Sequence, residues 1–168
     1  MRSGLKKFLI ALIAGFIIFF AHAPAYSQEM PPRPITVNLL QNLNFGAFYT
    51  GAAGGTVVIQ PSGFRTSTGN IILVTLGFLY YPAIFGLQGN PGSIIHILNG
   101  PDAILTGSNG GSMTLHLGDS QPASPVILNM APPSQTQIRI GGILVVGNPL
   151  VNPVGNYIGT FSIMFLQE

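Results

Sequence analysis

Apolar side chains recur at every second position along the last part of the chain, from Gly155 to Glu168. Residues two apart share one face of a β-strand. One face would therefore carry four large apolar side chains: Tyr157, Phe161, Ile163 and Phe165. The other face would carry Thr160 and Ser162 together with Ile158, Met164 and Leu166. This pattern predicts a long strand with one apolar face, which needs partner strands and a second layer to cover it.

Shorter segments of the same kind follow one another from residue 35 onwards, and glycine or proline separates them, as in Gly89-Asn-Pro-Gly92. We expect strands at 35–39, 43–46, 56–60, 70–76, 82–88, 93–98, 113–117, 126–130 and 137–146. Loops are expected at 49–55, 61–69 and 102–111, and a bend or bulge at Gly141-Gly142. No segment after residue 27 has the apolar spacing of a capped helix. The sequence therefore predicts an all-β fold, an antiparallel β-sandwich of about 7–9 strands.

The first residues have the pattern of an export signal. Arg2, Lys6 and Lys7 form a positive start, residues 8–20 are apolar, and Ala25 and Ser27 precede a plausible cleavage point. This predicts a signal peptide over 1–27, a proline-rich leader over 28–34 and one sandwich domain over 35–168. The apolar run is shorter than the roughly 20 residues that span a bilayer, although an uncleaved anchor remains the alternative. We expect export to the periplasm, the cell surface or the medium, with no membrane span after cleavage.

Cleavage at Ser27 would leave few charges. Three arginines (Arg33, Arg65 and Arg139) would face four carboxylates (Glu29, Asp102, Asp119 and Glu168), without any lysine. This balance excludes a basic surface for nucleic acid or anionic lipid. The chain has no cysteine, so a disulfide framework is excluded as well. So few charges also give weak protection of strand edges against association.

Candidate catalytic or metal-binding residues are scarce. His96, His116, Asp102 and Asp119 are the conventional ligand types in the middle of the chain, and His116-Leu-Gly-Asp119 spaces two of them by three positions. A zinc or calcium site normally needs three or more converging ligands. No serine lies in the Gly-x-Ser-x-Gly pattern of a hydrolase elbow. We therefore expect surface histidines, no metal, no cofactor and no enzymatic activity.

The remaining candidates are arginines and tyrosines. In a nearly uncharged sandwich, Arg65 and Arg139 are expected to have structural roles, bonding loop carbonyls or a carboxylate. The tyrosines could form a glycan-stacking surface, although packing in a core or an interface is the favoured role: Tyr49, Tyr80, Tyr81 and Tyr157.

Several motifs resemble, in order, those of an exported bacterial domain family of unknown function, number 4402. They are Leu43-Asn-Phe-Gly46; Gly55-Thr-Val-Val-Ile with Pro61, Gly63, Arg65 and Gly69; Ala83 and Phe85 with the Gly89–Gly92 turn; Gly142 before an apolar strand; and Gly155, Tyr157, Gly159 and Phe161. The ending is also similar to that of archaic chaperone–usher pilins of the spore-coat-protein-U type. Those pilins are incomplete immunoglobulin-like sandwiches that a neighbour's N-terminal strand completes.

The pilin resemblance implies an immunoglobulin-like sandwich that assembles through strand edges. Its partners would be further copies of the chain or a periplasmic chaperone and usher. Ile35, Val37 and Leu39 could serve as a donor strand, although a self-completed sandwich is the simpler alternative. The apolar face of the last strand is the other part expected to act in assembly: Tyr157, Phe161, Ile163 and Phe165. The leading hypothesis is a non-enzymatic, exported structural or adhesive surface protein. The second is a secreted carbohydrate- or ligand-binding module with its site in the Tyr49–Gly55 or Asp102–Gly111 loop.

Overall fold

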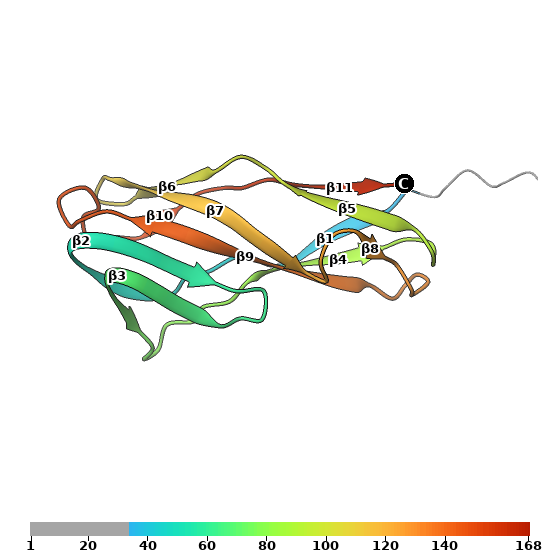
Figure 1. The fold of residues 1–168 in the computed structure, drawn as a ribbon, viewed down its shortest axis with the longest axis horizontal. Coiled ribbons are helices and arrows are strands. Elements are labelled where there is room, and N and C mark those ends of the chain that lie inside the picture. Colours follow the sequence, from blue (N-terminus) through green and yellow to red (C-terminus); the bar gives the residue numbers. More distant parts are fainter. Residues whose placement is uncertain (1–33) are drawn as a thin grey trace, which may run out of the picture. The chain divides into compact units, whose positions relative to one another are not determined.

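The computed structural model describes residues 34–168, and the regular secondary structure of this part consists of strands alone (Figure 1). The predicted signal peptide and nearly all of the predicted leader lie outside the described residues. The strands are β1 (Thr36–Gln41), β2 (Ala47–Ile59), β3 (Arg65–Val74), β4 (Ala83–Gln88), β5 (Ile94–Asn99), β6 (Ala103–Gly107), β7 (Ser112–Gln121), β8 (Val126–Ile127), β9 (Thr136–Val146), β10 (Tyr157–Ile158) and β11 (Ile163–Gln167).

The strands form two sheets, and all paired strands within each sheet are antiparallel. The larger sheet has the order β1-β4-β9-β7-β6-β10, and β2 joins it at β9 with β3 beyond. The smaller sheet has the order β11-β5-β8. The predicted all-β antiparallel sandwich is therefore confirmed. It has more strands than expected because β6 lies in a segment predicted as a loop and because the predicted C-terminal strand is divided into β10 and β11. The predicted strand at 43–46 is wrong, since this segment makes only an isolated bridge between Asn44 and Tyr81.

β9 is the central strand of the larger sheet. One of its edges pairs with β4 through Thr136–Ile140 and with β2 through Gly142–Val146, while the other edge pairs with β7. Gly141 is thus the point at which β9 exchanges one partner for another. The bulge that we predicted at Gly141-Gly142 lies instead on the facing strand, where the register of β7 shifts between Leu117 and Ser120.

Two clusters of buried apolar side chains lie on the inner face of the larger sheet. One contains Leu87, Ile138 and Ile140 of the larger sheet with Ile95 and Val126 of the smaller sheet. The smaller sheet therefore covers the half of the larger sheet that carries β4 and the beginning of β9. The other cluster is built around β2, β7 and the end of β9: Phe45, Val57, Ile59, Ile71, Ala103, Met113, Leu115, Leu144 and Val146.

The β2–β3 hairpin folds back on itself and so covers the second cluster. An extended strand rises about 3.3 Å per residue, which would separate the two ends of β3 by roughly 30 Å. Yet the side chain of Arg65, at the start of β3, donates a hydrogen bond of 2.7 Å to the carbonyl of Val74 at its end. The fold occurs where the β2–β3 register shifts, between Thr50 and Gly55. Phe48 and Leu73 consequently pack on the same core as Val57 and Ile59.

All three loops predicted from the sequence contain strand residues in the structure. In the 61–69 segment, β3 already begins at Arg65. The 49–55 segment belongs to β2, because its glycines allow one long strand to fold rather than end. Within the predicted 102–111 loop lies β6, which pairs with β7 through Ala103–Thr106. The alternating pattern of β6 covers too few residues to distinguish a strand from a loop in the sequence. β6 is a strand because β7 lies beside it and pairs with it.

The predicted long C-terminal strand is divided into β10 and β11. β10 pairs with β6 of the larger sheet, whereas β11 pairs with β5 of the smaller one. The alternation itself continues through the break, since Tyr157 and Phe161 pack on one core and Ile163 and Phe165 on the other. The sequence pattern fixes the buried face, and the change of sheet interrupts the strand.

Substitution of Gly69 tests how much the folded hairpin contributes to stability. The φ of Gly69 is +67°, and a Cβ there would lie 2.6 Å from the carbonyl oxygen of Gly54. Gly92 has a φ of +89° with no atom within 4 Å of a Cβ. We expect Gly92→Ala to lower the free energy of unfolding by about 1–2 kcal/mol, the cost of a left-handed backbone. Gly69→Ala should lower it by roughly 2–4 kcal/mol, because the facing backbone must also move.

Urea unfolding of the two variants measures this difference. Equal losses at both glycines would show that the close approach of the two backbones at the fold of the hairpin does not contribute to stability.

Candidate functional site

Among residues 34–168, one edge of β11 has no strand beside it. Within the described residues its one partner is β5, and the Glu168 N–H donates to the Ile94 carbonyl on that side. In an antiparallel ladder, successive residues point their N–H and C=O groups to opposite edges. The backbone groups that face the free edge therefore belong to the alternate residues, Ile163, Phe165 and Gln167.

The strand β1 extends the larger sheet beyond the reach of the smaller one. Val37 lies opposite Leu87, and Leu39 opposite Phe85, so both share the inner face of the sheet with those core residues. Their side chains are nevertheless 40% and 55% exposed. An inward-facing aliphatic residue that remains exposed lacks a covering element.

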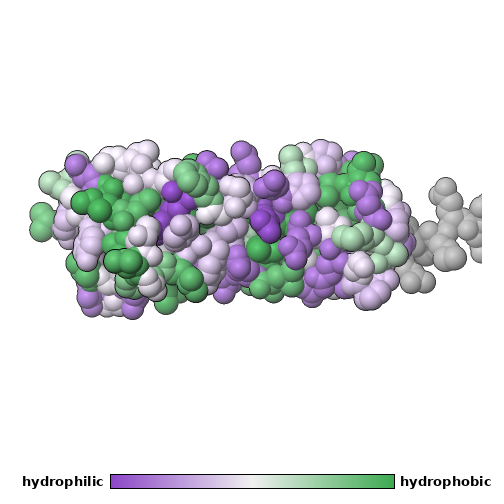
Figure 2. Space-filling view, turned by 90° about the horizontal axis from the view of Figure 1, so that it is seen from below, coloured by the Kyte–Doolittle hydropathy of each residue, from purple (hydrophilic) through white to green (hydrophobic). Residues whose placement is uncertain are grey.

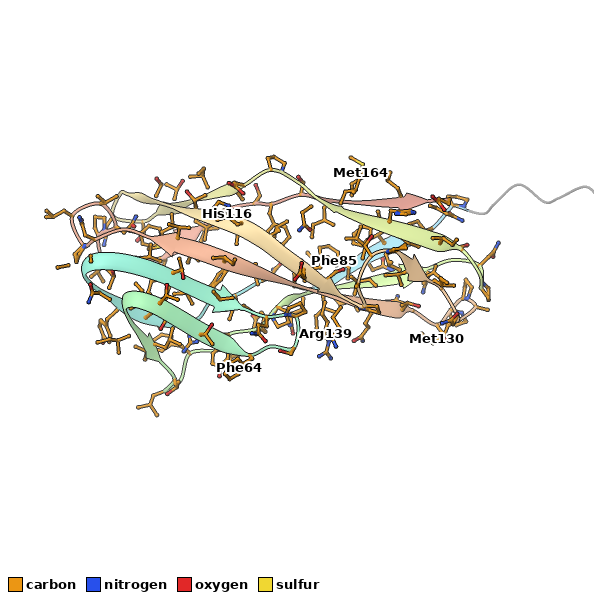
Figure 3. The ribbon with its side chains drawn as sticks, in the orientation of Figure 1. Phe64, Phe85, His116, Met130, Arg139 and Met164 are labelled. Carbon is orange, nitrogen blue, oxygen red and sulfur yellow. The ribbon has the colours of Figure 1, made fainter. Side chains whose placement is uncertain are left out.

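The free edge of β11 and the inner face of β1 belong to the same part of the sandwich. The rings of Phe85 on β4 and Phe165 on β11 lie 5.4 Å apart between their centroids, so β4 lies across from β11. Figure 3 shows Phe85 between the layers and Met164 of β11 pointing away from them. A strand added to β11 would therefore lie across from β1. We call this position, bounded by the free edge of β11 and by Val37 and Leu39, the strand slot.

The residues predicted for assembly have different surroundings. Ile163 and Phe165 are half-buried against the core under the smaller sheet, as is Ile35 just before β1. Tyr157 and Phe161 pack against the other core. Val37 and Leu39 lie in β1, which pairs with β4 of the same chain. The predicted donor strand is thus part of the chain's own sheet in this structure.

His96 and His116 each lie beside one carboxylate near the surface. His116 Nδ1 lies 2.6 Å from Asp102 Oδ1, and His96 Nε2 lies 3.0 Å from Glu168 Oε1. Asp119, which the sequence spacing placed with His116, belongs to neither pair. Each pair is half-exposed, and such pairs contribute about 0–1 kcal/mol. Across residues 34–168, no three histidine or carboxylate side chains converge as they would around a metal ion.

Arg65 occupies a socket of carbonyl groups rather than a salt bridge. Its Nη1 donates to the carbonyls of Phe45 (2.8 Å) and Ala47 (3.4 Å), and its Nη2 to that of Val74. The guanidinium also lies over the ring of Tyr80, 4.1 Å from the centroid, a favourable cation–π position. Burial lowers the pKa of Arg65 below its ordinary value, and the neighbouring Tyr80 opposes that shift.

Arg65 therefore has the structural role that the sequence predicted. Of the two kinds of partner left open, it bonds carbonyls, at Phe45 and at the ends of β2 and β3. Arg139, by contrast, is exposed and points away from the layers (Figure 3).

The four candidate tyrosines have separate roles. Tyr80 covers Arg65, and the backbone of Tyr81 exchanges hydrogen bonds with Asn44. The Tyr157 hydroxyl donates to the Pro153 carbonyl over 2.7 Å. Tyr49 is 69% exposed, and its hydroxyl has no hydrogen bond within the part of the chain that the structure describes.

Sequence reasoning missed Asn152, which is buried in the 147–156 loop. Its Oδ1 accepts the N–H of Gly147, and its Nδ2 donates to the Ser112 carbonyl over 2.7 Å. The signal was present in two Asn-Pro dipeptides, 148–149 and 152–153, which mark turns. Nothing in those dipeptides indicates which asparagine side chain is buried.

A family model matches residues 35–165, and its description is a domain of unknown function, DUF4402. The chain belongs to this family. No curated protein matches it, and neither does any solved structure. Along the described residues, no helix is long and apolar enough to cross a membrane.

The DUF4402 motifs can now be given structural roles. In Leu43-Asn-Phe-Gly46, Phe45 supplies a carbonyl to Arg65, and Gly46 (φ +71°) leaves room for the guanidinium, because a Cβ there would lie 2.6 Å from Nη1. Tyr157 holds the loop that precedes β10. These motifs therefore build the scaffold, whereas the strand slot depends on strand arrangement.

Arg65 and Arg139 form a matched pair of test positions. We expect Arg65→Met to lower the free energy of unfolding by about 2–4 kcal/mol, because buried carbonyls lose their donor. Arg65→Lys should recover only part of this, since an ammonium lacks the planar fork that reaches several acceptors. The exposed Arg139→Met should change stability by no more than about 0.5 kcal/mol. Chemical denaturation measures all three, and equal effects at both positions would contradict the socket.

Proposed function

We propose that this DUF4402 protein is a non-enzymatic, exported structural subunit that assembles, like a pilin, by accepting an extended segment of another subunit. The observation that carries the proposal is the pair Val37 and Leu39, which face inwards and are 40% and 55% exposed opposite an unpaired strand edge. Export is supported by the charged and apolar start of the sequence.

A strand added in the slot would pair with the free edge of β11 and would also cover Val37 and Leu39. A segment beside β11 would pair with the free backbone groups of Ile163, Phe165 and Gln167. Because side chains alternate along a strand, every second residue of the segment would face Val37 and Leu39. Main-chain hydrogen bonds would supply affinity, and the alternate aliphatic side chains would supply selectivity.

The slot admits one strand rather than a second folded sheet. If another molecule paired its own β11 with this edge, its β4 would occupy the layer across from the added strand, since β4 lies across from β11. That position already holds β1 of the first molecule. Because β1 already lies across from the added position, a single extended segment fits there. Two complete sandwiches cannot pair edge to edge at this place, although free edges commonly allow such association.

In this proposal Ile35, Val37 and Leu39 act on the accepting side. Donation by β1 would require it to leave β4, with which it pairs through Thr36–Leu39 and Gln41. The donor would be an extended segment of another copy or of a different subunit. A periplasmic chaperone would be expected to cover the same slot before assembly.

A self-complemented variant tests the slot. An Asn-Gly turn and a strand alternating valine and threonine would be added after Glu168, so that the new strand returns along the free edge of β11. We expect the free energy of unfolding to rise by about 2–4 kcal/mol from aliphatic burial and new hydrogen bonds. Amide exchange of Ile163 and Phe165 should slow, because their N–H groups gain acceptors.

The matched control carries aspartate at the valine positions, which would place charge against Val37 and Leu39. It should give neither effect. Unchanged exchange at Ile163 and Phe165 in the valine variant would contradict strand addition at this edge.

Assembly by the exported chain is tested by light scattering from micromolar to millimolar concentration. We expect oligomers that Gln167→Pro weakens, because proline removes one N–H from the free edge and leaves the β5 side intact. Met164→Ser, on the outer face of β11, is the control and should leave the oligomers unchanged. A strictly monomeric chain would exclude assembly among copies of this protein.

A further inference from the structure

A shallow hollow lies at the fold of the β2–β3 hairpin. Its volume is about 300 Å³, and residues 49–51 and 69–72 line it. The ladder between β2 and β3 is interrupted here, since pairing passes from Thr50–Ile71 directly to Gly55–Gly69. Gly51 and Asn70, which lie between these pairs, line the hollow. The hollow is therefore bordered by an irregular part of the ladder as well as by side chains.

One wall of the hollow is an exposed aromatic ring. Tyr49 and its cross-strand partner Ile72 are both 69% exposed, although each lies in a regular part of the hairpin. The face of an aromatic ring carries partial negative charge, so it attracts the weakly positive C–H groups of a flat ligand. Figure 2 shows hydrophobic patches on the end of the molecule that carries β2 and β3.

The opposite wall is polar and uncharged. Asn70 is exposed at the interruption, and its side chain makes no hydrogen bond within residues 34–168. Its amide offers both donors and an acceptor. The lining contains no acidic, basic or histidine residue: Tyr49, Thr50, Gly51, Gly69, Asn70, Ile71 and Ile72. A ligand of this hollow would therefore be neutral and rich in hydroxyl groups.

We propose that this hollow binds a neutral saccharide, with one pyranose ring stacked on Tyr49 and its hydroxyl groups bonded to Asn70. The volume is at the small end of the range for ligand pockets, about 300–1,000 Å³, so it suits one or two sugar rings. This inference is independent of strand addition, because none of its residues lies in the strand slot.

Nuclear magnetic resonance titration of the labelled exported chain tests the site. The probes are the methyl glycosides of glucose, galactose, mannose and N-acetylglucosamine, and lactose as a disaccharide. We expect at least one of them to bind with a dissociation constant near the millimolar range, about 1–10 mM. It should shift the Asn70 side-chain amide and the backbone amides of Gly51 and Gly69.

Three variants give the controls. Tyr49→Ala should weaken the binding about tenfold or more, whereas Tyr49→Phe should retain most of it because the ring remains. Phe64→Ala removes a similarly exposed ring, 63% exposed, outside the hollow, and should have no effect. Both positions are on the surface, and thermal unfolding verifies that each of the three variants folds.

No shift with any probe up to about 50 mM, far above a millimolar dissociation constant, would overturn the proposal. Shifts located elsewhere, or Tyr49→Ala binding as tightly as the unchanged chain, would overturn it too. Failure of this site would leave the self-complemented variant unaffected, so the two proposals are distinguishable.

Discussion

The larger sheet has one apolar face, and that face must be covered along its whole length. The molecule covers its two halves by different means. On one half the β2–β3 hairpin folds back over the core that it helps to build. On the other half a separate three-stranded sheet is laid across β4 and the beginning of β9. The folded hairpin covers the first half with its own strands. Within residues 34–168, the smaller sheet leaves β1 uncovered on the second half.

The half covered by the hairpin is held by a single buried cation. The carbonyls of Phe45 and Val74 lie where the chain changes direction, and Arg65 donates a hydrogen bond to each of them. The ring of Tyr80 lies against the guanidinium. A buried charge without a carboxylate is tolerable because several carbonyl dipoles and an aromatic ring surround it. The same folding creates the interruption beside Tyr49 and Asn70, so a structural requirement generates the hollow proposed to bind sugar.

The half covered by the smaller sheet is arranged differently. Its core is complete enough to bury Ile95, Leu128 and Ile138 fully, yet the smaller sheet stops one strand before the larger one. The resulting strand slot is polar along its backbone edge and aliphatic along its floor, which suits an extended peptide. The proposed strand addition at this slot and the proposed sugar binding at the hairpin are compatible in one chain, since they use different residues.

The sequence alone determined the fold class and much of the core, because alternation dictates which side chains share a face wherever a strand runs. Thus Tyr157, Phe161, Ile163 and Phe165 are all directed inwards, although β10 and β11 lie in different sheets. A structural role for Arg65 was also expected from the sequence, but the structure decided that its partners are carbonyls rather than a carboxylate. Tertiary structure alone decided that 49–55 is a folded strand, that β6 exists, and that His116 pairs with Asp102 rather than Asp119. It also decided that Val37 and Leu39 face inwards without cover. Alternation is a local property of the chain, whereas partners and covering layers depend on strands distant in sequence, so no local pattern could reveal which faces and edges stay uncovered within residues 34–168.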